Sequence, residues 1–196
     1  MCPDPDAGLV PAARHEADPP VKGGGGPIPG ALPEHDVVDQ VRRRGWCLAT
    51  AESMTGGLVA RRLAAAPGSG ACFRGGLVAY APVVKHEVLG VRPGPVVAAE
   101  AAVQMAAGAS RLFDADVAVA TTGVAGPDEL EGQPVGTVWL AVTTPDVERT
   151  ERHRFGGTPD EVVAAATDHA LMLLRTVLSS LAAGSAAGPE TAGGGT

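Results

Sequence analysis

Residues 50–91 read TAESMTGGLVARRLAAAPGSGACFRGGLVAYAPVVKHEVLGV. Apolar runs typical of strands alternate here with runs typical of helices, and glycine and proline separate them. The strands are expected at 46–51 and 76–80, and the helices at 56–66 and 83–89. A strand, a crossover helix and a second, parallel strand form the basic unit of α/β proteins. The stretch therefore predicts an α/β fold.

The same alternation continues on both sides of this stretch. Further helices are expected at 33–44, 98–113 and 158–181, and further strands at 116–121, 136–144 and 148–155. The strand at 116–121 is apolar throughout, as in the centre of a sheet, whereas the one at 148–155 alternates polar residues and suits an edge. The last two strands form a hairpin-like pair. We therefore expect a three-layer α/β/α sandwich with a mixed, mostly parallel sheet.

Composition divides the chain into three parts. Residues 1–31 and 182–196 are rich in glycine, proline and small residues, and they bury too little to offset the entropy of ordering. We predict that they form a flexible extension and a flexible tail around one ordered domain, 32–181. The last helix of that domain begins with a capping box, in which Thr158 caps the helix and Glu161 reaches back.

Length and charge exclude several classes of protein. The chain has 196 residues, which fits one ordinary α/β domain, and a formal net charge of −7. The negative charge argues against a nucleic-acid-binding protein, because phosphate contacts need clustered lysine and arginine. With 45% hydrophobic and only 3% aromatic residues, the core must consist of alanine, valine and leucine.

The cysteine and histidine content points to the cytoplasm. The chain has three cysteines, Cys2, Cys47 and Cys72, without a CxxC pair. An odd number cannot all pair in disulfides, which favours a reducing compartment over a disulfide framework. The five histidines show no spacing typical of zinc ligands. The N-terminus lacks a secretory signal, and no uninterrupted apolar run is long enough to span a bilayer. We therefore expect a soluble, cytoplasmic protein without a metal site.

Three stretches could carry chemistry, and each also has a purely structural interpretation. In the turn 52–57, hydroxyls and glycines precede a helix and either offer donors to an anion or simply cap the helix. Tyr80 and Lys85 follow a strand, so they either meet at the carboxyl edge of the sheet or are solvated. The loop 121–127 either supplies backbone donors or is a tight glycine turn. Asp128, Glu129 and Glu131 follow it, and they fit a solvated acidic loop better than a cation site.

Four blocks in a fixed order carry a resemblance. They are ESMTGG (52–57), PGSGACFRGGLVAY (67–80) with Lys85 five residues later, TTGVAGP (121–127) and PVGTVW (134–139). This order resembles the C-terminal domain of the CinA competence/damage-inducible proteins, which also stands alone as the nicotinamide mononucleotide (NMN) amidohydrolase PncC. The resemblance implies that the chain acts on a pyridine nucleotide, releasing ammonia from NMN in NAD recycling, without metal or cofactor. It also implies the stand-alone form.

The resemblance assigns roles to residues. It pairs Lys85 with a nucleophilic serine, for which Ser69 is the first candidate and Ser53 the second, and it places Tyr80 beside them. It assigns substrate binding to Ser53, Thr55, Gly56, Gly57, Gly70, Thr122 and Gly123. Amide hydrolysis needs such a nucleophile, a proton shuttle and donors for the developing oxyanion.

The chain also departs from the family. The family has its expected nucleophile at the second serine after Pro-Gly, and this chain has Gly70 there. Two arginines expected to bind the substrate phosphate are replaced by Pro159 and Val163. Arg152 or Arg154 could compensate for the missing arginines. Three hypotheses follow: an NMN amidohydrolase, a non-catalytic nucleotide-binding or regulatory module, and a hydrolase of a less anionic amide. An edge strand and an alanine-rich helix also offer surfaces for a homo-oligomer.

Overall fold

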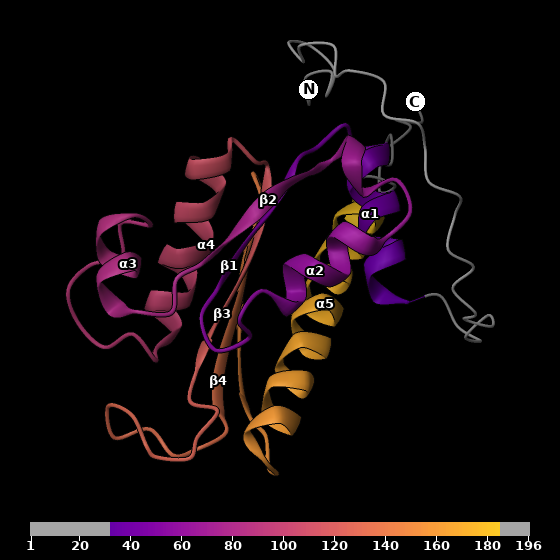
Figure 1. Ribbon diagram of the computed structural model, residues 1–196. Helices are drawn as coiled ribbons and strands as arrows, with labels where there is room; N and C mark the ends of the chain where they lie inside the picture. The colour runs from indigo at the N-terminus through magenta and orange to yellow at the C-terminus, as the bar shows by residue number, and fades with distance from the viewer. Residues whose placement is uncertain (1–31, 185–196) are drawn as a thin grey trace, which may run out of the picture.

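The computed structural model describes residues 32–184 (Figure 1). The predicted extension, 1–31, lies outside the described residues, and so does the tail from residue 185 onward. The last helix continues to Gly184, three residues beyond its expected end at 181, and the division into domain and tail stays a prediction. Alanine has the highest helix propensity, and the two alanines after Leu181 prolong the helix.

One mixed sheet organises the domain. Its strands lie in the order β2-β1-β3-β4-β5. Strand β1 is parallel to β2 and β3, and β4 is antiparallel to β3 and β5, so four strands run one way and only β4 runs the other. The predicted α/β sandwich is confirmed. In chain order the elements are α1 (Pro33–Arg43), β1 (Leu48–Glu52), α2 (Leu58–Ala65), the 3-10 turn η1 (Ser69–Ala71), β2 (Phe73–Val78), α3 (Pro82–Glu87), α4 (Ala99–Phe113), β3 (Val117–Gly123), β4 (Thr137–Thr143), β5 (Glu148–Arg154) and α5 (Pro159–Gly184).

Helices cover both faces of the sheet, with α1, α2 and α5 on one face and α3 and α4 on the other (Figure 1). Because side chains alternate along a strand, each inner strand supplies both cores. Leu48 and Val117 join the core under α1, α2 and α5. Ala49, Ala118 and Ala120 face α4, where small side chains on both sides let the helix lie close to the sheet.

Helix α5 is a core helix of this α/β domain. By length and composition alone its first 23 residues would pass as a membrane span, but half of the 18-residue window that meets this criterion is buried inside the domain. Val162, Ala166 and Leu174 on its inner side are fully buried. The predicted capping box at its start is confirmed, since the N–H of Thr158 donates to Glu161 Oε2 at 2.8 Å.

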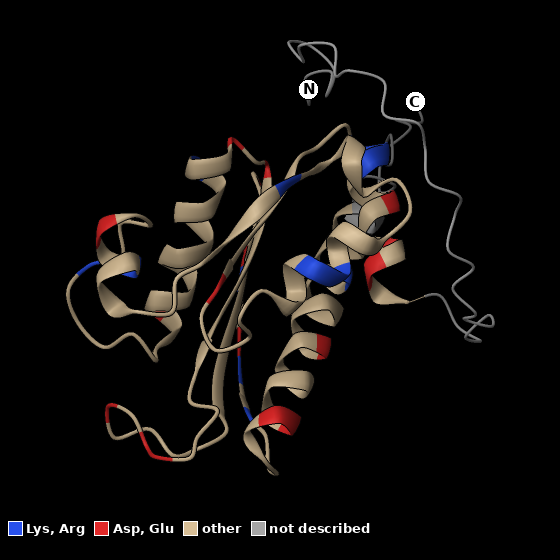
Figure 2. Cartoon of the chain, viewed as in Figure 1, with Lys and Arg blue, Asp and Glu red and all other residues tan. Residues whose placement is uncertain are grey.

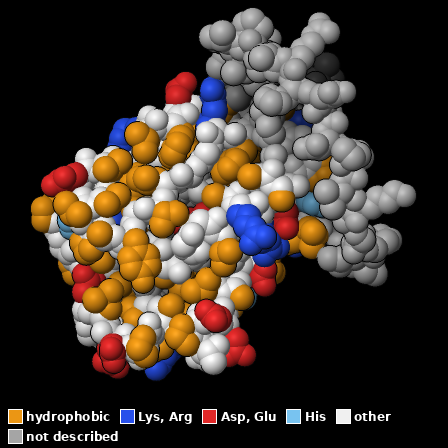
Figure 3. Space-filling model, viewed as in Figure 1, with side chains coloured by type: hydrophobic (Ala, Val, Ile, Leu, Met, Phe, Trp, Pro, Cys, Tyr) orange, Lys and Arg blue, Asp and Glu red, His pale blue; other side chains and the backbone are white. Residues whose placement is uncertain are grey.

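The described surface is apolar around β2 and α3. Figure 3 shows hydrophobic side chains spread over the face seen in Figure 1, and the large exposed ones near these elements are Val78, Tyr80, Val83 and Val88. Acidic residues mark the loop between β3 and β4 (Figure 2). Strand β2 is also an edge of the sheet. The edge strand of the predicted oligomer surface is β5 at the opposite edge, and self-association through it or through an alanine-rich helix stays a prediction.

The topology brings several loops together at one edge. Since β1, β2 and β3 are mutually parallel, the segments that follow them emerge side by side. Ligand sites in open α/β sheets form at this carboxyl edge. The loop before β4 reaches the same edge, because β4 runs antiparallel to β3.

Candidate active site

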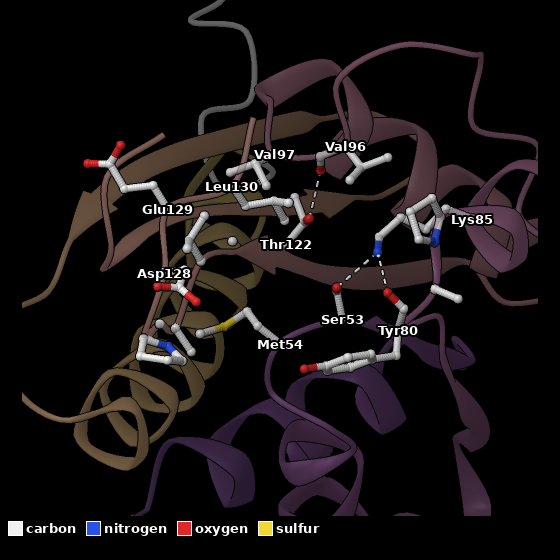
Figure 4. A pocket seen from close by; sticks show the side chains of 17 residues that line it. Ser53, Met54, Tyr80, Lys85, Val96, Val97, Thr122, Asp128, Glu129 and Leu130 are labelled. Carbon is white, nitrogen blue, oxygen red and sulfur yellow. Dashed lines mark hydrogen bonds between the residues drawn. The ribbon is translucent and has the colours of Figure 1, made fainter. Parts of the chain in front are cut away.

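A cavity of about 450 Å³ opens at this carboxyl edge (Figure 4). Its volume lies in the range of small-molecule sites. Its walls come from the segments after β1, β2 and β3, from α3, and from the segment before α4. The lining residues are Ser53, Met54, Tyr80, Ala81, Pro82, Lys85, Val96, Val97, Thr122, Gly123, Val124, Ala125, Gly126, Pro127, Asp128, Glu129 and Leu130.

Ser53 and Lys85 form a buried pair in this cavity. Ser53 directly follows β1, and its N–H donates to the carbonyl of Thr121 at 2.9 Å, which holds the turn against β3. Lys85 lies on α3, and its Nζ donates to Ser53 Oγ at 3.0 Å and to the carbonyl of Tyr80 at 3.1 Å. Lys85 is only 2% exposed and Ser53 is also buried, so the amine contacts the hydroxyl at the inner wall of the cavity.

Burial changes the acid–base properties of Lys85. Removing the ammonium from water lowers the pKa of Lys85 below its usual value, and the negative charge of Glu131 opposes this by raising it. A neutral amine keeps one lone pair, which can accept the Ser53 proton while an N–H still donates to the Tyr80 carbonyl. The pair can therefore generate a serine nucleophile in the manner of a serine–lysine dyad.

Tyr80 contributes to the site through its backbone. Its carbonyl holds Lys85, whereas its ring is 74% exposed and stands beside Ser53 at the side of the cavity (Figure 4). The structure thus brings Tyr80 and Lys85 together, as the sequence indicates. A catalytic role of the phenol stays a prediction.

Ser69 and Gly70 lie at the other edge of the sheet. They belong to η1, which precedes β2, whereas Ser53 follows the neighbouring parallel strand. The six residues of β2 separate the two edges by roughly 20 Å. The Ser69 hydroxyl donates to the carbonyl of Ala64 at 2.8 Å. The predicted pairing of Ser69 with Lys85 is therefore wrong, and Gly70 removes no serine from this cavity.

The turn after β1 is held by Glu52, whose side chain is buried. Its carboxylate accepts the N–H groups of Gly57, Val59 and Ala60 at 3.0, 3.1 and 2.8 Å. It also accepts the Thr55 hydroxyl at 2.7 Å. Glu52 thus caps α2 from inside the chain, a role that the sequence analysis missed. A glutamate that ends an apolar strand directly before a glycine turn and a helix was the available signal.

The interpretation of this turn as an open anion site is therefore corrected. Thr55, besides contacting Glu52, lies 2.7 Å from the hydroxyl of Thr121. Gly56 and Gly57 have φ of 60° and 98°, which glycine adopts without strain. These three residues serve the fold, and of the predicted turn residues Ser53 lines the cavity.

Thr122 and Gly123 line the cavity from the end of β3, where the sequence places them. The Thr122 hydroxyl donates to the carbonyl of Val96 at 2.7 Å and so ties β3 to the segment before α4. A side chain at Gly123 would bring its Cβ to 2.6 Å from the carbonyl oxygen of Thr137. Glycine is therefore required there for the close approach of β3 and β4.

Glu131 joins two walls of the cavity. Its carboxylate accepts the N–H of Val96 at 2.8 Å and that of Val97 at 3.0 Å, which fixes the loop before β4 against the segment before α4. Its φ of 55° is left-handed, an uncommon conformation for a residue other than glycine. The prediction that Glu131 belongs to a solvated acidic run is therefore wrong for this residue, whose carboxylate is engaged with backbone N–H groups. Nothing in the local pattern distinguishes it from its neighbours, because its partners are distant in the chain.

Replacing Glu131 with glutamine should lower the pKa of Lys85 further. The variant removes the one negative charge that raises this pKa and leaves burial in place. An NMR titration of the Lys85 side chain measures the effect. Glu129→Gln is the matched control, since it removes an exposed carboxylate that also lines the cavity, and it should change the pKa much less. An unchanged or raised pKa in Glu131→Gln would contradict the assignment.

Arginine does not line the described cavity. Lys85 is the only lysine or arginine among its lining residues. Arg152, which could have compensated for the missing arginines, lies over the Trp139 ring at 5.9 Å. Pro159 begins α5 close to the cavity wall, with Cγ 3.8 Å from where a Cβ of Gly126 would lie. Among the described residues, no group of three or more His, Cys, Asp or Glu is placed to hold a metal.

Comparisons with known proteins agree with this fold. A model of the CinA C-terminal domain matches residues 32–178. A CinA-like protein of Frankia casuarinae is 44% identical over 151 residues, which are 74% of this chain and 35% of that protein. A CinA-like protein of Syntrophobacter fumaroxidans is 40% identical over 152 residues, or 74% of this chain and 36% of that protein. The chain thus spans about a third of the length of these curated relatives.

Solved structures are similar over most of the described domain. A CinA superfamily protein from Klebsiella pneumoniae has a TM-score of 0.72 and 36% identity, covering 76% of this chain and 96% of that one. The competence/damage-inducible protein CihA from Agrobacterium tumefaciens has a TM-score of 0.71 and 33% identity, covering 79% of this chain and 99% of that one.

Proposed function

Because the chain belongs to the CinA C-terminal domain family, we propose that it is a cytoplasmic hydrolase of pyridine-nucleotide carboxamides. The reaction converts the carboxamide and water into a carboxylic acid and ammonia, which leave as carboxylate and ammonium at neutral pH, with NMN as the substrate that the sequence resemblance implies. Ser53 is the nucleophile and Lys85 the general base. The observation that carries the proposal is the buried 3.0 Å contact between Lys85 Nζ and Ser53 Oγ inside the cavity.

The first half of the reaction forms an ester on Ser53. Neutral Lys85 accepts the hydroxyl proton as Oγ attacks the carboxamide carbon. The C–N bond then breaks, and the Lys85 ammonium returns the proton to the leaving nitrogen, so that ammonia departs and the amine is neutral again. The lowering of the Lys85 pKa by burial favours both steps, because it makes the amine easier to deprotonate before the attack and the ammonium a stronger acid after it.

The second half releases the acid. Water takes the place of ammonia, Lys85 accepts one of its protons, and the resulting hydroxide attacks the ester carbonyl. Collapse of this intermediate breaks the bond to Ser53 Oγ, and the Lys85 proton returns to the serine. The apolar side chains of Met54, Val96 and Leu130 line the cavity beside the reacting groups.

A non-catalytic binding module is the alternative function. The sequence argument for it depends on Gly70 in the place of a serine, and this residue lies outside the cavity. The alternative still predicts a distinct result, namely a pyridine nucleotide that protects the fold against heat and is not hydrolysed.

Ammonia release by wild-type protein, Ser53→Ala and Ser69→Ala tests the proposal. We expect turnover in the wild type, a loss of at least about a thousandfold in Ser53→Ala, and near-normal turnover in Ser69→Ala. Both NMN and the corresponding nucleoside, nicotinamide riboside, should be offered. Loss of turnover in Ser69→Ala with full activity in Ser53→Ala would refute the assignment of the nucleophile. Wild-type protein that binds both compounds and hydrolyses neither would establish the binding module.

A further inference from the structure

The cavity has two chemically different ends. Ser53 and Lys85 lie at one end, and Asp128 lies at the opposite end, with Met54 between them (Figure 4). In the same view the carboxylate of Asp128 is turned toward Met54, whereas that of Glu129 points away. A ligand whose carboxamide reaches Ser53 therefore extends the rest of its structure toward Asp128.

The charges of the lining residues at the two ends limit the chemistry of the ligand beyond its carboxamide. Lys85, the only cation among the lining residues, is buried and already donates to Ser53 Oγ and to the Tyr80 carbonyl. Asp128 and Glu129 are exposed acids that belong to the cavity wall. A carboxylate accepts hydrogen bonds from sugar hydroxyls and attracts a cationic ring, but it repels a phosphate.

We propose that the cavity selects a carboxamide on a cationic ring with free ribose hydroxyls and no phosphate, and that Asp128 determines this selectivity. The inference rests on the proposed amide hydrolysis and changes its preferred substrate from the nucleotide, which the sequence resemblance implies, to the corresponding nucleoside. Nicotinamide riboside is such a compound, whereas NMN differs from it only by the phosphate. The two compounds therefore isolate the effect of the phosphate from that of the carboxamide.

The first test compares the two compounds as substrates. We expect wild-type protein to favour the riboside over NMN by about tenfold in kcat/KM, the size of a single charge effect near the surface of a protein. Asp128→Asn should bring this ratio close to one, mainly through KM, because asparagine still offers an oxygen to the hydroxyls but no negative charge. Glu129→Gln is the matched control and should leave the ratio within about twofold of wild type.

The second test separates this inference from the proposed function. Calorimetric Kd values of both compounds on Ser53→Ala protein report selectivity without any hydrolysis. Tighter binding of the riboside, reduced in the double variant with Asp128→Asn, supports the inference even if wild-type protein hydrolyses neither compound. Preference for NMN, or a ratio that Asp128→Asn does not change, overturns it. NMN binding that strengthens with protein concentration also overturns it, since a second copy would then supply the cation.

Discussion

Replacing Lys85 with methionine should reduce ammonia release by about a thousandfold or more and leave the fold intact. General acid–base catalysis by a positioned side chain contributes roughly 10² to 10⁴ to a rate, and Lys85 serves both halves of the proposed reaction. Methionine has a similar length and no charge, so it suits a position that is 2% exposed. Steady-state ammonia release and circular dichroism measure the two outcomes. Turnover within about tenfold of wild type would refute Lys85 as the base.

The pH dependence of the free energy of unfolding should reveal the lowered pKa of Lys85 without any substrate. Because burial lowers the pKa of Lys85 in the folded chain, the unfolded chain binds more protons between that lowered pKa and the usual value of 10.5. The free energy of unfolding should therefore rise with pH through this window. Lys85→Met should remove that rise. Urea titrations of both proteins at several pH values measure the difference, and an identical slope in both would mean that Lys85 is solvated.

Replacing Glu52 with alanine should lower the free energy of unfolding by about 3 kcal/mol or more, because an unsatisfied buried donor costs roughly 1 to 3 kcal/mol. The carboxylate accepts three N–H groups at the start of α2, and the variant leaves all of them without a partner. The Thr55 hydroxyl also loses this acceptor. Since Ser53 is the next residue, catalysis should fall with stability.

Urea unfolding of Glu52→Ala, with Glu87→Ala as the control, measures this effect. Glu87 is an exposed glutamate at the end of α3, and its loss should change the free energy of unfolding by no more than about 0.5 kcal/mol. If Glu52→Ala unfolds at nearly the wild-type urea concentration, water or the backbone must satisfy the three donors. The capping role of Glu52 would then be wrong.

The order of strands and helices follows from local patterns, which explains why it could be predicted. The apolar strand 117–123, the capping box at Thr158 and the glycine-bounded helices each depend on residues close together in the chain. Parallel strands also place the residues that follow them at one edge, so it was predictable that Tyr80, Lys85 and Thr122 line one cavity. The same rule excludes Ser69 from this edge, because Ser69 precedes a strand. Ser69 was nevertheless predicted as the nucleophile, because the resemblance to the family motif favoured it.

The sequence by itself determined the α/β sandwich and the edge of the sheet at which the site lies, because secondary structure and strand direction depend on neighbouring residues. The tertiary structure alone decided that Ser53 meets Lys85, that Glu131 pins Val96 and Val97, and that the donors of the α2 turn are already occupied. These contacts join residues 32 to 35 positions apart or depend on burial. Burial is also what lowers the pKa of Lys85, and no local pattern encodes it.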